Sequence, residues 1–138
     1  MTWKILLATD GSPFSLKAAD VALEFAQKNS AEIVVIYVTP YTLFTTEYGF
    51  PIPQPSLNEI AQKIIDSTVE KFGENNIPYK SRIENGDPAD KICDIAEEEN
   101  INLIIIGTSG QTGINRFLLG SVSAKVVRHA PCSVMVVR

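Results

Sequence analysis

The stretch that decides the fold is Gly107-Thr-Ser-Gly-Gln-Thr-Gly-Ile-Asn-Arg-Phe-Leu-Leu-Gly-Ser-Val-Ser123, which directly follows the apolar run Leu103-Ile-Ile-Ile106. Four branched apolar residues between an asparagine and a glycine predict a short strand that is buried on both faces, as in a parallel sheet. The glycines that follow permit sharp turns and a close approach of a ligand to backbone amides. Ser121 is predicted to cap a helix whose first N–H groups, from Ser121 to Ser123, form an anion site. The anion expected there is a phosphate.

The rest of the chain alternates between strand-like and helix-like patterns. Strands are predicted at residues 3–9, 32–38, 79–84, 103–106 and 133–137, and helices are predicted to begin at Ser12, Ser56, Pro88 and Ser121. This alternation is typical of a parallel sheet with helices on both faces. A chain of 138 residues has room for one such core, so we expect a single domain over residues 1–138.

Residues 39–55 interrupt this alternation. The segment combines four prolines with four aromatic residues, namely Pro40, Pro51, Pro53 and Pro55 with Tyr41, Phe44, Tyr48 and Phe50. Because the prolines exclude a regular helix or a central strand, we predict a long flexible loop over 39–55. Ser56 stands at the capping-box spacing from Glu59, which predicts that the next helix begins at Ser56.

Composition excludes several classes of function. The chain has 16 acidic and 12 basic residues and no long run of like charge, so it offers no basic surface for nucleic acid or acidic lipid. No apolar run reaches the ~18 residues of a membrane span, and the N-terminus lacks a secretory signal pattern. We therefore expect a cytoplasmic protein that binds neither nucleic acid nor membrane. Cys93 and Cys132 lie outside any Cys-x-x-Cys pattern and are expected to be reduced structural thiols.

Four blocks of the sequence resemble the universal stress protein family. They are the opening Trp3 to Ser12, the second strand Ile33 to Val38, the closing Val126 to Val137, and the pattern Gly107-x2-Gly110-x9-Gly120-Ser121. The last pattern is similar to the nucleotide-binding signature that marks the ATP-binding members of the family. The resemblance covers nearly the whole chain and is least clear from Thr39 to Pro55.

The resemblance implies a doubly wound α/β fold of the Rossmann-like kind, similar to the adenine nucleotide alpha hydrolases. It implies a five-stranded parallel sheet in the order 3-2-1-4-5 and a homodimer formed through the last strand, Ser133 to Val137. In such sheets, ligands bind beyond the carboxyl ends of the strands where the winding direction reverses. Two strands end in residues suited to a ligand, the first at Asp10-Gly11 and the fourth at Gly107.

The candidate nucleotide-binding residues combine the phosphate loop with positions that the resemblance assigns. They are Ala8, Asp10, Val38, Ile106, Gly107, Gly110, Arg116, Gly120, Ser121, Val122 and Ser123. By resemblance, Ala8 and Asp10 fall where family members contact the nucleoside, and the backbone of Val38 falls where it would read the adenine edge. The hydroxyls of Ser121 and Ser123 are expected to add donors to the backbone amides.

Several of these residues also have a purely structural interpretation. The glycines and Ser121 could serve only the geometry of a long turn and its cap, and Asp10 could simply stabilise its own Asp-Gly turn. Otherwise the Asp10 carboxylate accepts ribose hydroxyls or shares a divalent cation with the phosphates. Arg116 could contact phosphate or only keep the loop soluble. His129 is expected to stand at a helix C-terminus, where its partial positive charge is favourable.

The common enzyme motifs are missing, and no catalytic residue is identified. Leu119 and Val122 flank Gly120-Ser121, so the lysine of a P-loop is absent. Gln111 replaces the final glycine of a nucleophile elbow, which makes Ser109 a poor nucleophile. The sequence has no zinc-ligand spacing. Any Mg²⁺ or Mn²⁺ is expected to be held mainly by the phosphates of ATP.

These observations favour an ATP-binding universal stress protein that acts as a nucleotide-dependent sensor or regulator. Two alternatives stay open: a slow ATPase or phosphotransferase that uses the same pocket, and a non-catalytic interaction module. ATP is the expected ligand, with AMP or ADP as alternatives, and a downstream protein is the expected partner. Tyr41, Phe44, Tyr48 and Phe50 suggest that loop 39–55 either folds over the nucleotide, contacts the dimer partner or is simply mobile.

Overall fold

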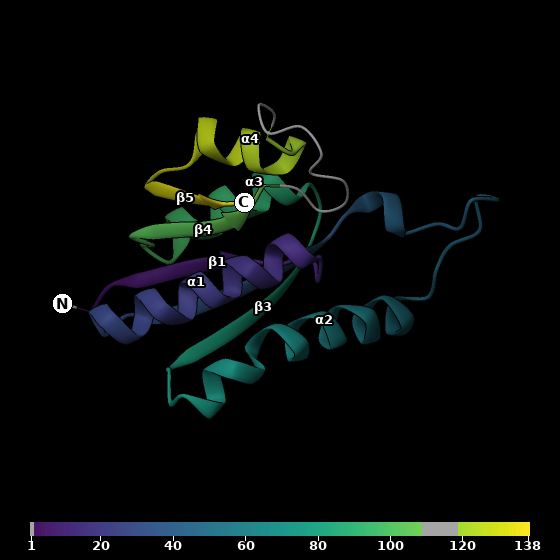
Figure 1. The fold of residues 1–138 in the computed structure, drawn as a ribbon. Helices are drawn as coiled ribbons and strands as arrows, with labels where there is room; N and C mark the ends of the chain where they lie inside the picture. Colours follow the sequence, from purple (N-terminus) through teal and green to yellow (C-terminus); the bar gives the residue numbers. More distant parts are fainter. Residues whose placement is uncertain (1, 109–118) are drawn as a thin grey trace.

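The computed structural model describes residues 2–108 and 119–138, and the strands of this part form one parallel sheet (Figure 1). The strands are β1 (Lys4–Ala8), β2 (Glu32–Thr39), β3 (Tyr79–Asn85), β4 (Leu103–Gly107) and β5 (Ser133–Val137). Their order in the sheet is β3-β2-β1-β4-β5, and every neighbouring pair is parallel. The predicted doubly wound α/β sheet with the order 3-2-1-4-5 is therefore confirmed.

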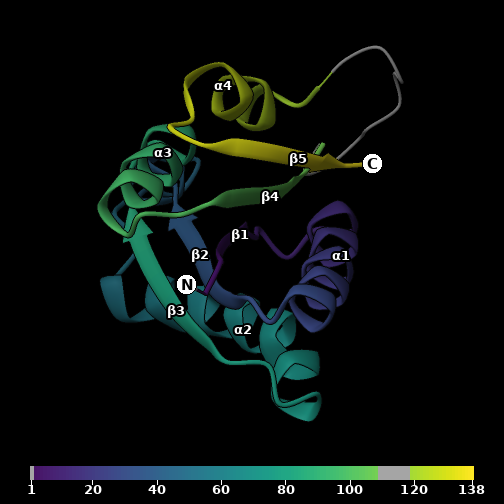
Figure 2. The same ribbon diagram turned by 90° about the vertical axis from the view of Figure 1, so that its left-hand side faces the viewer.

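Helices cover both faces of the sheet. They are α1 (Pro13–Asn29), α2 (Gln54–Glu74), α3 (Pro88–Glu98) and α4 (Ser121–His129), with a short 3₁₀ turn η1 (Tyr41–Leu43) between β2 and α2. Figure 2 shows α1 and α2 on one side of the sheet and α3 and α4 on the other. The chain winds from β1 outward to β3 and then returns to β4 on the opposite side of β1. This reversal between β1 and β4 is the point at which ligands bind in sheets of this kind.

The central strand β1 is apolar on both faces because a core lies on each side of it. Ile5 and Leu7 point toward α1 and α2, while Leu6 and Ala8 point toward α3 and α4. Side chains alternate between the two faces of a strand, so a strand covered on both sides reads as a continuous apolar run. The same reasoning explains Leu103 to Ile106, the run from which β4 was predicted.

The segment between β2 and α2 differs from the prediction at both of its ends. Strand β2 continues through Thr39, and α2 begins at Gln54 instead of Ser56. The Ser56 amide donates to the carbonyl of Pro53 (3.0 Å), so Ser56 lies inside the first turn and the predicted capping box is not formed. Pro55 fits that turn because its missing N–H costs nothing there. The segment leaves the body of the protein (Figure 1), and its predicted flexibility stays a prediction.

Candidate nucleotide site

A pocket of about 1040 Å³ lies at the carboxyl ends of β1, β2 and β4, where the winding reverses. Nine of the predicted site residues line it: Ala8, Asp10, Val38, Ile106, Gly107, Gly120, Ser121, Val122 and Ser123. The other two, Gly110 and Arg116, lie outside the described residues, as does Ser109. The fold thus gathers residues from three strands and from the starts of α1, α3 and α4 around one cavity.

Helix α4 begins at this pocket without a side-chain cap. Its cap residue is Gly120, with Ser121 as the first helical residue, so the prediction that Ser121 caps the helix is wrong. The first intrahelical bond runs from the Ala124 amide to the Gly120 carbonyl (2.9 Å). The amides of Ser121, Val122 and Ser123 precede that bond, at the positive end of the helix dipole. A helix start of this kind suits an anion.

The Ser123 hydroxyl has a structural task. It donates toward the carbonyl oxygens of Thr108 (2.8 Å) and Gly120 (3.0 Å), and the residue is only 2% exposed. A hydroxyl has one proton, so this geometry contradicts the expectation that Ser123 donates to a ligand through its side chain. The contact fixes the first turn of α4 to the end of β4. Ser123 can therefore donate to an anion only through its backbone amide.

Gly107 is required by packing between the sheet and α1. A Cβ atom at this position would lie 2.8 Å from both the backbone carbon and the backbone oxygen of Phe14. Such a distance is too short for any side chain, and the neighbour is backbone that cannot rotate away. The sequence suggested that Gly107 gives a ligand access to the amides, whereas the structure shows that it lets the first turn of α1 approach β4.

Asp10 stabilises the turn that leads from β1 into α1. Its Oδ1 atom accepts the amide of Ser12 at 2.9 Å, and Gly11 adopts the positive φ of +79° that a glycine tolerates. The structural interpretation of Asp10 is therefore correct. Because the side chain is exposed and lines the pocket, a contact with a ligand is compatible with this role.

A buried group of hydroxyls beneath this turn was missed by the sequence analysis. Thr9 Oγ1 lies 3.0 Å from Thr68 Oγ1 and 3.2 Å from Ser15 Oγ, and it accepts the Gly11 amide at 3.3 Å. Thr68 belongs to α2, so the group connects β1, α1 and α2 at the floor of the pocket. No local pattern in the sequence signals it, because its members come from three separate elements.

The opposite end of the pocket is lined mainly by apolar side chains, with the Asp87 carboxylate beside them. Ile36, Val38 and Ile92 line it together with Pro88 and the residues from Pro40 to Leu43. Val38 is 7% exposed and Ile92 3%, so the floor is rigid core rather than surface. The pocket therefore has two ends of different chemistry: the start of α4 beside β4, and an apolar end beside β2 and β3.

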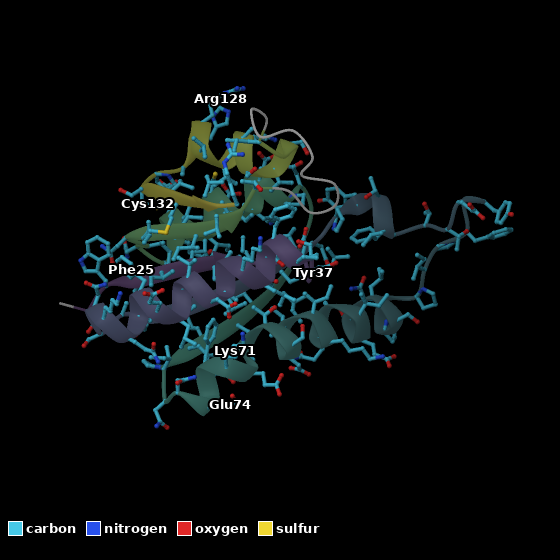
Figure 3. The ribbon with its side chains drawn as sticks, viewed as in Figure 1. Phe25, Tyr37, Lys71, Glu74, Arg128 and Cys132 are labelled. Atoms are coloured by element: carbon cyan, nitrogen blue, oxygen red, sulfur yellow. The ribbon has the colours of Figure 1, made fainter. Side chains whose placement is uncertain are left out.

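The charged side chains of the pocket are acidic. Among the described residues that line it, Asp10 and Asp87 carry charge and no lysine or arginine is present. Asp87 caps α3 by accepting the Asp90 amide (3.0 Å), and this bond, helped by Lys125 Nζ at 3.1 Å, lowers the pKa of the Asp87 carboxyl. Tyr37 also lies at this end of the sheet (Figure 3), and burial, with a smaller contribution from Asp10, raises its phenol pKa.

The two cysteines are free thiols with no part in the pocket. Cys132 precedes β5 and so lies at the other end of the sheet from Tyr37 (Figure 3). Cys93 is half-buried on α3, and burial raises the pKa of both thiols. In the part of the chain that the structure describes, no three His, Cys, Asp or Glu residues are grouped to hold a metal ion. His129 ends α4, as predicted.

The fold and the pocket define a doubly wound α/β protein with its site at the strand switch point. The pattern of the universal stress protein family matches residues 1–138, and this chain belongs to that family. It is similar to the universal stress protein MJ0531 of Methanocaldococcus jannaschii, with 35% identity over 98% of this chain and 81% of the relative. It is 34% identical to YxiE of Bacillus subtilis over 98% of each chain.

Solved structures support the same fold. The hypothetical protein MJ0577 superimposes with a TM-score of 0.84 at 26% identity, covering 99% of this chain and 96% of that one. Some neighbours below 25% identity share the fold and were solved with an adenine nucleotide. A universal stress protein in complex with cAMP has a TM-score of 0.76, one from Archaeoglobus fulgidus with dAMP 0.74, and one from Arabidopsis thaliana with AMP 0.72. They share 24%, 20% and 21% identity with this chain and cover at least 98% of it and 90% of their own length.

No helix among the described residues is both long and apolar enough to cross a membrane.

Proposed function

We propose that this chain binds an adenine nucleotide in the pocket at the switch point and acts as a nucleotide-dependent regulator in the response to stress. ATP is the expected ligand, with ADP and AMP as alternatives. The observation that carries the proposal is the pairing of an uncapped helix start at one end of the pocket with an apolar end at the other. The bound cAMP, dAMP and AMP of structural neighbours support the adenine nucleotide as the class of ligand.

The phosphates would lie at the start of α4. The amides of Ser121, Val122 and Ser123 supply donors, and the helix dipole favours the negative charge. Gly107 ends β4, and Gly120 directly precedes these amides. Gly110 and Arg116 complete the set that the sequence predicts for phosphate binding, and their contribution stays a prediction.

The nucleoside would cross β1 toward the apolar end. The backbone of Val38 would read the adenine edge, with Ala8 and Ile106 as the apolar surface beneath the nucleoside. Asp10 would accept ribose hydroxyls or share a cation with the phosphates. Because the described lining holds the exposed Asp10 carboxylate and no lysine or arginine, a triphosphate would bind best with Mg²⁺ or Mn²⁺, held mainly by its own oxygens.

A regulatory role fits this pocket better than rapid turnover. Fast phosphoryl transfer needs positioned positive charge around the γ-phosphate and a residue that orients water. Backbone amides bind the ground state and the transition state to similar extents, so they favour affinity over rate. We expect hydrolysis to take minutes or longer per turnover, against the ~1 to 1,000 per second of typical enzymes. A radiolabel assay that finds several turnovers per second, lost in Asp10→Ala, would favour the ATPase or phosphotransferase instead.

Recovery of the ligand tests the proposal. The purified chain would be denatured and the released compounds separated by chromatography, and the expected product is ATP, ADP or AMP. ATP with Mg²⁺ at ~100 times its dissociation constant should add about 2.7 kcal/mol to the free energy of unfolding, roughly 6 to 15 °C in Tm. A chain that releases no nucleotide and shows no shift at millimolar ATP would favour the non-catalytic interaction module.

The regulator would act as a homodimer formed through β5. This edge strand has the apolar sequence Val134-Met-Val-Val137 with half-buried side chains, whereas the other edge strand, β3, carries Lys80, Arg82 and Glu84. Apolar, uncharged edges invite pairing, and charged ones discourage it. Val136→Lys is expected to give a monomer in sedimentation at micromolar concentration, and a wild-type monomer would contradict the dimer.

A cytoplasmic location remains a prediction, with which the two free thiols agree.

A further inference from the structure

The turn that follows β2 forms part of the pocket wall and is separate from the rest of the segment before α2. Pro40, Tyr41 and Leu43 line the pocket, whereas Tyr48 and Phe50 do not. The more distant part folds on itself through the bonds from the Thr46 amide to the Phe50 carbonyl (2.7 Å) and from the Ile52 amide to the Phe44 carbonyl (2.7 Å). Only the first few residues after β2 are therefore placed to meet a ligand.

Tyr41 is positioned by the turn of its backbone and by a neighbouring ring, and its hydroxyl lies beside Gly86. The 3₁₀ turn η1 fixes its backbone, because the Leu43 amide donates to Pro40 and the Phe44 amide donates to Tyr41, each at 3.0 Å. Its ring meets the ring of Phe44 edge-on, with centroids 5.3 Å apart and planes at 88°. Its hydroxyl borders Gly86, 3.5 Å from the point where a Cβ atom would stand. Although the residue is fixed in this way, it is 65% exposed.

The place of Tyr41 in the sheet order assigns it to the nucleoside end. Helix α4 follows β4 on one side of β1, while Tyr41 follows β2 and borders Gly86 after β3 on the other side. The lining at this end includes Val38, Ile92 and the carboxylate of Asp87. That carboxylate is already paired with Lys125 Nζ at 3.1 Å, and a phosphate gains nothing from the apolar walls. An uncharged aromatic base gains contact area from both the floor and an exposed ring.

We propose that Tyr41 is the outer wall of the base end of the pocket and that its ring packs against the face of the adenine. This inference rests on the proposed binding of an adenine nucleotide and adds a residue that contributes to the choice of ligand. Stacking between a base and an aromatic side chain is worth about 1–3 kcal/mol by alanine substitution, which is roughly 5- to 150-fold in affinity. The pocket should therefore prefer ATP over a triphosphate without a base.

The test compares ATP with tripolyphosphate, each titrated calorimetrically into the full chain with Mg²⁺. Tyr41→Ala is expected to weaken ATP binding roughly 5- to 150-fold and to leave tripolyphosphate binding at its wild-type strength. Tyr41→Phe keeps the ring and should bind ATP within about twofold of the wild type. Tyr48→Ala is the matched control, because Tyr48 is an exposed tyrosine of the same segment that does not line the pocket.

The outcomes distinguish an error in the role of Tyr41 from an error in the proposed binding of an adenine nucleotide. If the wild type binds ATP and Tyr41→Ala binds it equally well, the role of Tyr41 is wrong and the proposed function stands. A loss that Tyr48→Ala shares, or one that extends equally to tripolyphosphate, would also overturn the role, because it would indicate a general disturbance of the segment. A wild-type chain that binds no ATP would overturn the proposed function and the role of Tyr41 with it. An unchanged Tm for each variant verifies that the fold is intact, as expected for exposed side chains.

Discussion

Helices α3 and α4 both begin at the pocket and lie on the same face of the sheet, but they begin differently. The first turn of α3 is closed by its own residue Asp87, whose carboxylate accepts the Asp90 amide. Helix α4 begins after Gly120, which has no side chain to offer. In a helix with a side-chain cap, an N–H group of the first turn already donates to that side chain. In a helix whose cap is glycine, the N–H groups of the first turn can donate to a bound anion instead. This difference is why we assign phosphate to α4 and not to α3.

The largest effect is expected when α4 is given the kind of start that α3 has. Gly120→Asp would place a carboxylate over the amides of Ser121 to Ser123 and add a negative charge where the phosphates lie. We expect ATP affinity to fall more than ~100-fold in calorimetric titration, because occupancy of the amides and charge repulsion act together. The free energy of unfolding should change by only a few tenths of a kcal/mol, since aspartate and glycine are both accepted as caps.

Gly73→Asp is the matched control for this variant. Gly73 lies near the end of α2, where an added Cβ meets nothing within 4 Å and the pocket is not involved. ATP affinity should stay within about twofold of the wild type, because this charge lies outside the pocket. Equal loss in both variants would mean that added charge, and not the start of α4, weakens binding.

The next effect concerns the contact that holds β4 against α1. Gly107→Ala is expected to lower the free energy of unfolding by about 1–3 kcal/mol, since its Cβ would collide with the backbone of Phe14. Chemical denaturation measures this directly. ATP affinity of the folded fraction should fall far less than in Gly120→Asp. Unchanged stability together with lost affinity would restore the interpretation of Gly107 as a residue that meets the ligand.

Removal of the cap of α3 should have a smaller effect, and on stability alone. Asp87→Ala is expected to cost about 1 kcal/mol in the free energy of unfolding, the usual cost of losing a side-chain cap. ATP binding should be unchanged or slightly tighter, because a carboxylate leaves the pocket lining. If Asp87→Ala lowered ATP affinity as much as Gly120→Asp does, the start of α3 would contribute to nucleotide binding as the start of α4 does, which would contradict the assignment of phosphate to α4 alone.

The smallest expected effect is on the pH dependence of stability, and it comes from the Asp87 carboxylate that caps α3. The pKa of Asp87 is lowered in the folded protein by the Asp90 amide and then by Lys125. A carboxyl whose folded pKa is depressed contributes stability above its unfolded pKa and loses it as the pH falls through the folded value. Wild-type stability should therefore decrease below pH ~4 more steeply than that of Asp87→Asn, as followed by denaturation at each pH. Parallel pH profiles would contradict this contribution of Asp87.

Much of the fold was accessible from the sequence, since strands buried on both faces leave unmistakable apolar runs such as Leu103 to Ile106. The strand order came from the resemblance of four sequence blocks to a family, and not from periodicity. The site was less predictable wherever a residue's task depends on a distant neighbour. Position 107 requires glycine because the backbone of Phe14 lies next to it, and the Thr9 hydroxyl forms a hydrogen bond with the hydroxyl of Thr68. No local pattern contains those contacts.

The helix starts show the same limit on a finer scale. Ser121 and Ser56 both have the residue type of a cap, yet each lies within the first turn of its helix. The glycine before Ser121 takes the extended cap conformation, and Pro55 lets α2 begin two residues early. Residue preference places a helix start to within a turn, while the neighbouring glycine or proline decides which residue is the cap.

The most direct test of the central claim is to follow backbone amides by NMR in the ¹⁵N-labelled chain as ATP and Mg²⁺ are added. The largest changes in amide chemical shift are predicted at the start of α4, at Ser121, Val122 and Ser123. The chemical shift of the Asp90 amide at the start of α3 should change little, because this amide already donates to the Asp87 carboxylate. Small shifts at Ser121 to Ser123, or shifts of equal size at both helix starts, would contradict the assignment of phosphate to α4.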